Sequence, residues 1–224
     1  MPLQHLPIWI QLGAFMLAIN AGMVNVLGLI TTLHQTISHM TGNASLLAQA
    51  LALQHFDVVI FLVLVILSFV LGSSYSGYIL GSSHFEFGRR YGIPLSLVTL
   101  FILLCWIFIP YHPHYALLWA SAAMGVQNAM VSHYQGAIIR TTHVSGVLTD
   151  LGLAIGHLLK GLPVEKRRIM LHVLILTGFI LGGIIATLVY PYLQLNAFLL
   201  PAILSFTLCV VYWWIYFQNS CAQK

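Results

Sequence analysis

The sequence predicts an all-α integral membrane protein with six transmembrane helices and two re-entrant half-helices, built as an inverted internal repeat. Three observations lead to this prediction. The composition is strongly apolar, two matching polar segments interrupt the apolar sequence, and several landmarks recur in the same order in the two halves of the chain.

The composition indicates an integral membrane protein. Of the 224 residues, 60% are hydrophobic and only 5% are charged, and the mean hydropathy is +0.95. Soluble domains carry about 25% charged residues. The length fits one compact helical bundle without a separate soluble domain. The three cysteines form neither a disulfide pattern nor a zinc pattern.

Six apolar segments are long enough to be membrane-spanning helices, which need roughly 17–25 residues. They run approximately over Pro7–Leu33, Asp57–Gly81, Pro94–Pro110, His114–His133, Arg168–Tyr190 and Leu195–Phe217. Two further helical segments, about Thr41–Leu53 and Ser145–Lys160, are too short to cross a bilayer alone. We therefore expect these two to be re-entrant.

Each short segment begins inside a polar interruption of the apolar sequence. The first interruption reads TISHMTGNASLL from Thr36 to Leu47, and the second reads RTTHVSGVLTDL from Arg140 to Leu151. Aligning the two histidines places Thr-Gly of the first on Ser-Gly of the second. A G-x-x-N motif precedes each interruption. Matching interruptions in two halves of a transporter point to its substrate site.

Further landmarks extend the duplication over the whole chain. The run FVLG ending at Gly72 matches FILG ending at Gly182, and Pro94–Trp106 has the same spacing as Pro201–Trp213. Residues 1–110 and 111–224 are therefore predicted to be two repeat units. The offset grows from 104 at the histidines (143 − 39) to 110 at the glycines (182 − 72), and we assign the growth to the basic loop 161–168.

The basic residues predict the topology. They gather in the loops 82–91 and 161–168, and such clusters mark cytoplasmic loops. Three crossings and one re-entrant segment per unit place both loops, and both termini, on the cytoplasmic side. Eight crossings would place the two loops on opposite sides. Because three crossings is an odd number, the units are inverted, and the two re-entrant tips enter from opposite faces.

The two interruptions are the predicted substrate site. Backbone at membrane depth must be hydrogen-bonded within the protein or line a wet cavity. The start of the helix that follows offers free N–H groups, which favour anionic or carbonyl-bearing ligands. The candidate binding residues are Asn25, His39, Thr41, Gly42, Asn43, Asn128, Arg140, Thr142, His143, Ser145 and Gly146.

Only the second interruption is charged, through Arg140 and Asp150, which correspond to Thr36 and Leu46 in the first. An ionisable group inside a bilayer is costly and indicates a function. Arg140 could attract a ligand anion or pair with Asp150, and Asp150 could exchange a coupling proton. The alternative is a purely structural Arg140–Asp150 pair, with Asp150 also favouring its helix N-terminus.

The polar uncharged candidates have two interpretations. His39 and His143 could bind substrate or carry protons, or each could hydrogen-bond the backbone at the broken helix. Asn25, Gln127 and Asn128 could contact a ligand or bridge neighbouring spans, and bridging is the commoner role of intramembrane amides. The segment from Gly72 to Gly77 favours close helix packing, with a pore lining as the alternative.

An enzyme, a metal carrier, a cofactor protein and a nucleic-acid-binding protein are all disfavoured. The chain has no nucleophile motif, no H-E-x-x-H, no phosphate loop and no paired carboxylates. Its eleven histidines are scattered without carboxylate or thiolate neighbours, so no metal site and no cofactor is expected. The few basic residues mark topology.

The interruptions and the motifs before them resemble a known family. The runs AGMVNVLGL and SHMTGN of the first half, with MGVQNA and RTTHVSGVLTDLG of the second, are similar to the YoaK family of small bacterial multi-span proteins, classed by an uncharacterised domain. The resemblance covers about Leu12 to Phe217. It implies a permease-like inner-membrane protein with no assigned substrate. The family often has Asp where this chain has Asn25, which argues against a mechanism with two coupling carboxylates here.

Three functions remain in competition. The first is a secondary transporter or permease for a small polar, perhaps anionic, solute that binds between the two tips at mid-membrane. The second is a channel whose filter is formed by the same segments. The third is a non-transporting membrane scaffold or sensor. The expected partners are the lipid bilayer and a small-molecule solute, and a homodimer is left open.

Overall fold

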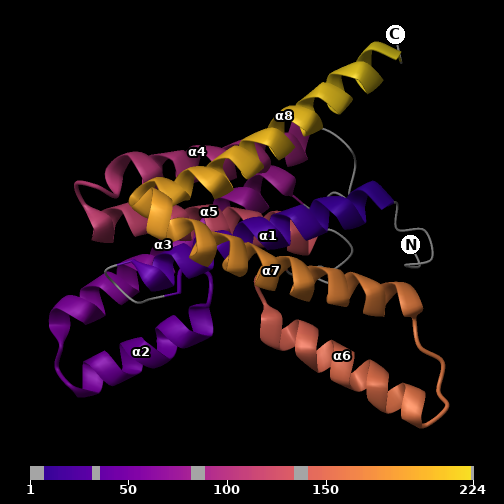
Figure 1. Cartoon of the computed structure of the whole chain (residues 1–224), viewed down its shortest axis with the longest axis horizontal. Coiled ribbons are helices and arrows are strands. Elements are labelled where there is room, and N and C mark those ends of the chain that lie inside the picture. The colour runs from indigo at the N-terminus through magenta and orange to yellow at the C-terminus, as the bar shows by residue number, and fades with distance from the viewer. Residues whose placement is uncertain (1–7, 32–35, 82–88, 134–140, 223–224) are drawn as a thin grey trace.

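All the described segments form helices joined by short connections. The computed structural model describes residues 8–31, 36–81, 89–133 and 141–222. In chain order the helices are α1 (Ile8–Ile30), α2 (Met40–Ala52), α3 (Phe56–Leu80), α4 (Arg89–Phe108), α5 (Pro113–His133), α6 (Val144–Leu159), α7 (Lys166–Leu193), the 3-10 helix η2 (Gln194–Phe198) and α8 (Leu199–Ala222) (Figure 1). The prediction of an all-helical protein is confirmed.

The helix bounds follow the predicted segments, with the largest differences at α8, which begins at Leu199 and ends at Ala222, and at α4. This helix begins at Arg89 and contains Pro94 in its interior, so the basic pair Arg89–Arg90 forms its first turn instead of ending a loop. The predicted apolar segment started at Pro94. Here the helix extends five residues further toward the basic end.

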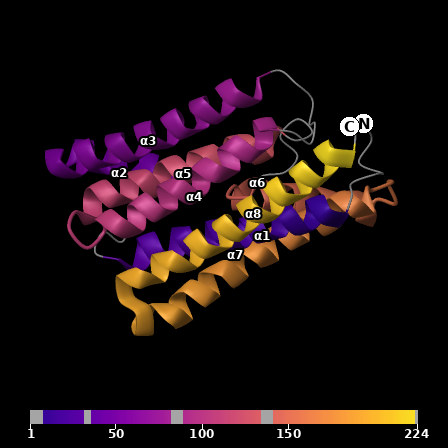
Figure 2. The same cartoon turned by 90° about the horizontal axis from the view of Figure 1, so that it is seen from above.

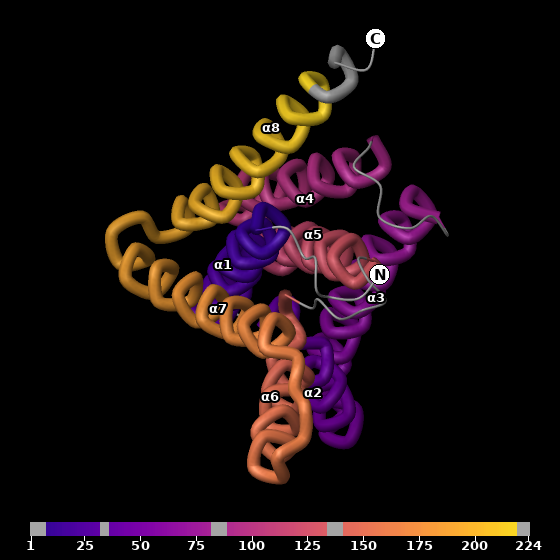
Figure 3. The backbone as a smooth tube through the Cα atoms, turned by 90° about the vertical axis from the view of Figure 1, so that its right-hand side faces the viewer, coloured from indigo at the N-terminus to yellow at the C-terminus, as the bar shows by residue number. Residues whose placement is uncertain are grey.

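Two helices form the centre of the bundle. Seen end-on, α1 and α5 lie in the middle, α7 and α3 flank them, α4 and α8 cover one side, and α2 and α6 project from the opposite side (Figure 3). The central helices are buried over most of their length, and Ala18 and Val24 of α1 and Met124 and Val126 of α5 are fully enclosed.

A close backbone contact joins α1 to α7. A Cβ atom added to Gly22 would run into the carbonyl oxygen of Phe179, and one added to Gly182 would run into that of Ile19. Each helix therefore brings a glycine against the backbone of the other. Small residues allow such an approach between membrane helices, whose association depends on packing and not on a hydrophobic force.

The same contact recurs between α3 and α5. A Cβ on Gly125 would meet the carbonyl oxygen of Phe69, and one on Gly72 would meet that of Ala122. Gly125 and Ala122 follow Gly22 and Ile19 by 103 residues (125 − 22 and 122 − 19). The first helix of each half therefore packs on a long helix of the other half: α1 packs on α7, and α5 packs on α3.

The helices of the two halves run in opposite directions. Figure 2 shows the start of α1, the end of α8, the end of α3, the start of α4 and the connection from α6 to α7 at one end of the bundle. The connections from α2 to α3, from α4 to α5 and from α7 to α8 lie at the other end. Because α4 and α7 begin with Arg89–Arg90 and Lys166–Arg168, these two basic segments share one end.

By length and composition, four helical stretches in the described chain could cross a membrane. They are Ile8–Ile30, Phe56–Leu80, Arg89–Phe108 and the long stretch Lys166–Gln218, which contains α7 and most of α8. The large apolar side chains of these stretches are exposed on the outside of the bundle, as on α3 with Leu67, Leu71 and Tyr78. This is a helical protein of the membrane type.

The two short helices differ in length. α2 has 13 residues and α6 has 16, and the connections that follow them are residues 53–55 and 160–165. Three of the six extra residues of the second half therefore lengthen α6 by nearly one turn, and only the other three lengthen the loop. The sequence analysis assigned all six to the basic loop, because helix ends are hard to place between two apolar runs.

Candidate functional site

The two short helices begin in the same way. His39 precedes α2 with φ −90° and ψ 74°, and His143 precedes α6 with φ −95° and ψ 66°. A Cβ added to Gly42 would lie 2.9 Å from Nδ1 of His39, and one added to Gly146 would lie 2.5 Å from Nδ1 of His143. Each imidazole therefore lies against the first turn of the helix that follows, where only glycine leaves it room.

The first tip, residues 36–43, is anchored to α1. The side-chain oxygen Oδ1 of Asn25 accepts hydrogen bonds from the Ser38 N–H at 3.0 Å and from the Ser38 hydroxyl at 3.1 Å. Asn43, which is fully buried, donates from Nδ2 to the carbonyl oxygen of Thr36 at 3.0 Å. The non-helical backbone of the tip is thus held by two amides, as polar groups inside a membrane protein require.

The second tip, residues 141–146, is anchored to α5. The hydroxyl of Thr142 donates to Oδ1 of Asn128 at 2.6 Å, at the positions equivalent to Ser38 and Asn25. A second amide, that of Gln127, donates from Nε2 to the Thr141 hydroxyl oxygen at 3.1 Å. Asn128 and Gln127 therefore bridge α5 and the second tip, which is one of the two roles predicted for these amides.

Gln127 also ties α5 to α1. Its Nε2 donates to the carbonyl oxygen of Leu17 at 2.9 Å, and its Oε1 accepts from Nδ2 of Asn20 at 3.0 Å. Gln127, Asn20 and Thr141 are all fully buried. The equivalent position in the opposite half is Val24 for Gln127, Ala123 for Asn20 and Ile37 for Thr141. All three are apolar, so this network belongs to the second tip alone.

The two anchors predict a difference in stability between matched variants. Asn25→Ala leaves a buried backbone N–H and a hydroxyl without their acceptor, whereas Asn128→Ala removes the acceptor of one hydroxyl. We expect a loss of about 1–3 kcal/mol for Asn25→Ala and about 1 kcal/mol for Asn128→Ala. Thermal unfolding in detergent, with hydrogen exchange at the Ser38 amide, measures both. An equal or larger loss for Asn128→Ala would contradict this account of the anchors.

A pocket of about 420 Å³ lies between the two tips. It takes side chains from both of them and from α3 and α5. Its lining consists of Ser38, His39, Met40, Thr41, Phe69, Ser73, Asn128, Ala129, Ser132, Thr142 and His143. Five of the predicted binding residues line it, namely His39, Thr41, Asn128, Thr142 and His143.

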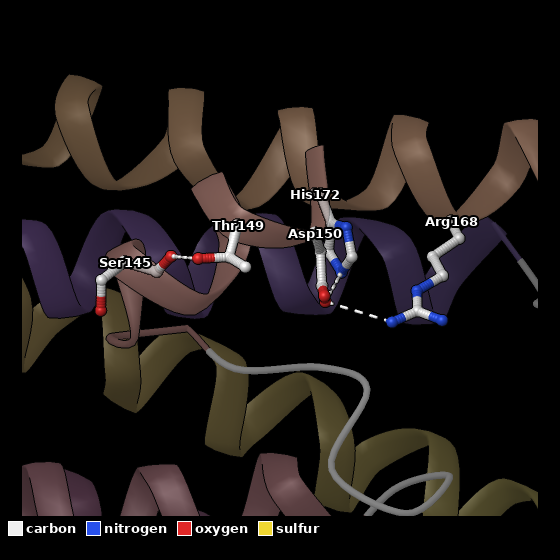
Figure 4. Close-up of polar contacts among 5 residues, drawn as sticks. All are labelled: Ser145, Thr149, Asp150, Arg168 and His172. Atoms are coloured by element: carbon white, nitrogen blue, oxygen red, sulfur yellow. Dashed lines mark hydrogen bonds and ion pairs between the residues drawn. The ribbon is translucent and has the colours of Figure 1, made fainter. Parts of the chain in front are cut away.

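The remaining predicted residues support the tips or lie elsewhere. Asn25 and Asn43 hold the first tip from behind, and Gly42 and Gly146 make room for the two imidazoles. Ser145 is exposed in the first turn of α6, where its carbonyl oxygen accepts from Thr149 at 2.9 Å (Figure 4). Arg140 lies outside the described residues.

Asp150 is paired with α7 and does not line the pocket. Its Oδ2 lies 3.2 Å from a terminal guanidinium nitrogen of Arg168 and 3.5 Å from Nε2 of His172 (Figure 4). A pair with Arg140 was one of the two predicted alternatives for Asp150, and Arg140 lies outside the described residues. Within the described residues, Asp150 has two partners from the helix packed against α6.

The pocket also contains residues that the sequence analysis did not select. Phe69 and Ser73 come from α3, and Ser132 comes from the end of α5. Ser73 belongs to the small-residue segment that was interpreted as helix packing. Gly72 serves that packing role, while Ser73 beside it faces the pocket and donates to the Gly125 carbonyl oxygen at 3.0 Å.

Within the described part of the chain, no group of three or more His, Cys, Asp or Glu side chains is placed to hold a metal ion. The pocket lining offers hydroxyls, one amide and two imidazoles, and it includes no lysine, arginine, aspartate or glutamate. Such a lining can hydrogen-bond a small polar molecule.

Comparison with known proteins places the chain in a family. The sequence model of the family described as "protein of unknown function (DUF1275)" matches residues 13–211. No curated protein and no solved structure matches the chain. The match agrees with the resemblance to an uncharacterised family seen in the two interruptions. Because it extends over most of the chain, this helical protein of the membrane type belongs to the DUF1275 family.

Proposed function

We propose that the protein is a permease for a small polar solute, which binds in the pocket between the two tips. The observation that carries this proposal is the pocket itself, lined by equivalent residues of two short helices that run in opposite directions. Transporters built from inverted repeats bind substrate near the midplane at discontinuous helices. The proposed location is a bacterial inner membrane, with both termini in the cytoplasm.

The geometry of the helices supports six crossings with two re-entrant segments. α2 has 13 residues and would span only about 20 Å, less than the roughly 30 Å of a hydrocarbon core. The basic starts of α4 and α7 share one end of the bundle, as the positive-inside rule requires of cytoplasmic segments. The repeated glycine contacts support an inverted duplication of residues 1–110 and 111–224.

The chemistry of the pocket supports a solute that accepts hydrogen bonds. Both α2 and α6 begin at the pocket, and helix N-termini carry a partial positive charge with free N–H groups. The lining residues carry no acidic side chain that would repel an anion. The volume falls within the roughly 300–1,000 Å³ of small-molecule sites. We therefore favour a small neutral or anionic solute.

The packing of the short helices supports movement during transport. α2 packs mainly against α3, and α6 packs mainly against α7, while α1 makes extensive contacts with α7, and α5 with α3 and α4. A helix with a single main packing partner can shift at low cost. Movement of one tip against the other would open the pocket to either side in turn, as alternating access requires.

Cysteine accessibility tests whether the pocket is a wet pathway. In a protein whose Cys105, Cys209 and Cys221 are replaced by serine, we expect Ser132→Cys to react with a membrane-impermeant thiol reagent. Ser74→Cys on the exposed face of α3 is the matched control and should remain unreactive in lipid. Absence of reaction at Ser132→Cys from both sides of the membrane would contradict the proposal.

The same two variants test transport once a solute is found. Proteoliposomes are screened with small neutral polar and monoanionic solutes, and uptake is expected to saturate. Reagent attached at Ser132→Cys should block uptake, because it fills the pocket, whereas treatment of Ser74→Cys should leave uptake intact. Uptake that never saturates would favour a channel, and no uptake of any solute would favour a scaffold.

A further inference from the structure

A charged cluster in the second half has no role in the pocket. It consists of Asp150 on α6 with Arg168 and His172 on α7, and the same carboxylate oxygen faces both partners (Figure 4). The side chain of His172 is only 3% exposed, while those of Asp150 and Arg168 are 34% and 43% exposed. We call these three residues the Asp150 cluster.

The first half shows that the fold does not need charges at these positions. The equivalents of Asp150, Arg168 and His172 are Leu46, Val58 and Leu62 (150 − 104, 168 − 110 and 172 − 110). Leu62 is as buried as His172, and Leu46 and Val58 are each 39% exposed. The three equivalent positions of the first half are therefore apolar and have a similar pattern of burial. Since the first half packs without charges at these positions, the buried His172 and its charged partners indicate a function.

We propose that the Asp150 cluster is a proton-binding site that couples proton movement to the second tip, a role that rests on the proposed permease function. His172 takes a proton on its imidazole from water and later returns it to water. Arg168 remains paired with Asp150 in both states. While His172 is protonated, Asp150 is tied to α7 by two cations, and after the proton leaves, only the Arg168 pair remains.

The surroundings of His172 are consistent with a local site. Apart from Asp150, the titratable groups of α6 and its two caps are His143 at the N-terminal end and His157 and Lys160 near the C-terminal end. α7 itself brings Glu165 as its N-cap and Lys166 and Arg167 in its first turn. Neither α1 nor η2, which also pack against α7, contains a titratable side chain. Within the described residues, the ion pairs of these helices join Asp150 to Arg168 and to His172.

The position of the cluster defines its access and its target. Arg168 is the third residue of α7 and His172 the seventh, so the cluster lies near the end of the bundle where the basic segments gather. Asp150 follows His143 by seven residues on one helix, and His143 lines the pocket. A change in the ion pairs of Asp150 therefore acts on α6, the helix that begins at the second tip. The first tip lacks this proton dependence, because the equivalent residues on α2 and α3 are apolar.

A distance measurement tests the proton site without any solute. The full chain, with its native cysteines replaced by serine, carries spin labels at Ile155→Cys on α6 and Val173→Cys on α7, both exposed. Between about pH 5 and about pH 8, a range that brackets ordinary histidine titration, the α6–α7 distance should lengthen and its distribution broaden. The equivalent pair Leu51→Cys and Val63→Cys, on α2 and α3, should show no change.

Two variants decide whether His172 is responsible. His172→Leu copies the first half at a buried position, so it should fold and lose the pH response. His157→Leu replaces an exposed histidine on α6 and should keep it. The inference is overturned if the response survives in His172→Leu, or if the α2–α3 pair responds as well.

Uptake separates this inference from the proposed function. In proteoliposomes that transport an identified solute, a pH gradient should drive accumulation in the parent protein. His172→Leu should keep downhill uptake and lose accumulation. If accumulation persists in His172→Leu, coupling through the cluster is overturned while the permease function stands. If the parent takes up no solute, the permease function fails, and the distance measurement still decides whether His172 binds the proton.

Discussion

Gly125→Ala should destabilise the protein by about 1–3 kcal/mol, the usual effect of overpacking a close-packed interior. The added methyl group would collide with the carbonyl oxygen of Phe69, which is fixed in the backbone of α3 and cannot rotate away. The helices must therefore separate along the whole crossing. In a membrane, where packing is the main force between helices, separation removes contacts that lipid tails do not replace with equal fit.

Matched glycines make this prediction specific. Gly22→Ala should cause a similar loss, because Gly22 meets the carbonyl oxygen of Phe179 in the equivalent crossing. Gly77→Ala is the control, since nothing lies within 4 Å of a Cβ at this position on the same α3 helix. The midpoint of thermal unfolding in detergent and the monodisperse fraction after purification measure the effect. Equal stability of Gly125→Ala and Gly77→Ala would contradict the crossing geometry.

Double variants test whether the α1–α7 crossing and the α3–α5 crossing are independent of each other. Gly72 and Gly125 lie in one crossing, so once Gly125→Ala has separated the helices, Gly72→Ala should add little. Gly22 and Gly125 lie in different crossings, and their losses should add within a few tenths of a kcal/mol. If the losses of Gly72→Ala and Gly125→Ala were additive, the two glycines would not share a single crossing of α3 and α5.

The helices and tips could be predicted from the sequence because each depends on local pattern. Apolar length predicts a spanning helix, and a polar interruption at membrane depth predicts a broken one. The alignment of His39 with His143 selected two segments, and residues of both line one pocket. Close packing was also predicted for the segment that begins at Gly72, since small residues mark close helix approach, and Gly72 does meet the backbone of α5.

The partners across helices could not be predicted in the same way. The sequence analysis sought a partner for Asp150 within its own interruption, at Arg140. The structure places Arg168 and His172 opposite it, because α6 and α7 are joined by a short connection and pack antiparallel. Which residues of two packed helices face each other depends on rotation and register, and apolar spans with weak amphipathicity do not encode these openly.

Part of the pocket lining could not be predicted from the sequence for the same reason. His39 and Thr142 were selected because they belong to an interruption, but Phe69 and Ser73 lie in the middle of an apolar span. Their role follows from the crossing of α3 and α5, which turns one face of α3 toward Asn128. One signal was available. Ser73 belongs to a segment of small residues for which the sequence analysis kept a lining role as its alternative.

Gln127→Val should destabilise the protein by about 1–3 kcal/mol, because it leaves buried polar groups without partners. Gln127 accepts from Asn20 and donates to Thr141, and all three side chains are fully buried. Valine is the residue that the first half has at the equivalent position, Val24, so the replacement suits a helix crossing of this shape. The loss should therefore come mainly from the stranded groups, and only a smaller part from the change in volume.

A double-mutant cycle separates these two contributions. Asn20→Ala/Gln127→Val copies the residues Ala123 and Val24 and removes both partners at once. Its loss of stability should be smaller than the sum of the two single losses, by about 0.5–3 kcal/mol of coupling. Adding Thr141→Ile, as at Ile37, should recover stability further, because the last stranded hydroxyl disappears. Thermal unfolding of the single, double and triple variants measures the cycle. Strictly additive losses would mean that the side chains do not act as one network. Recovery in the triple variant would show that the second tip, like the first, can be held in place without these three buried polar side chains.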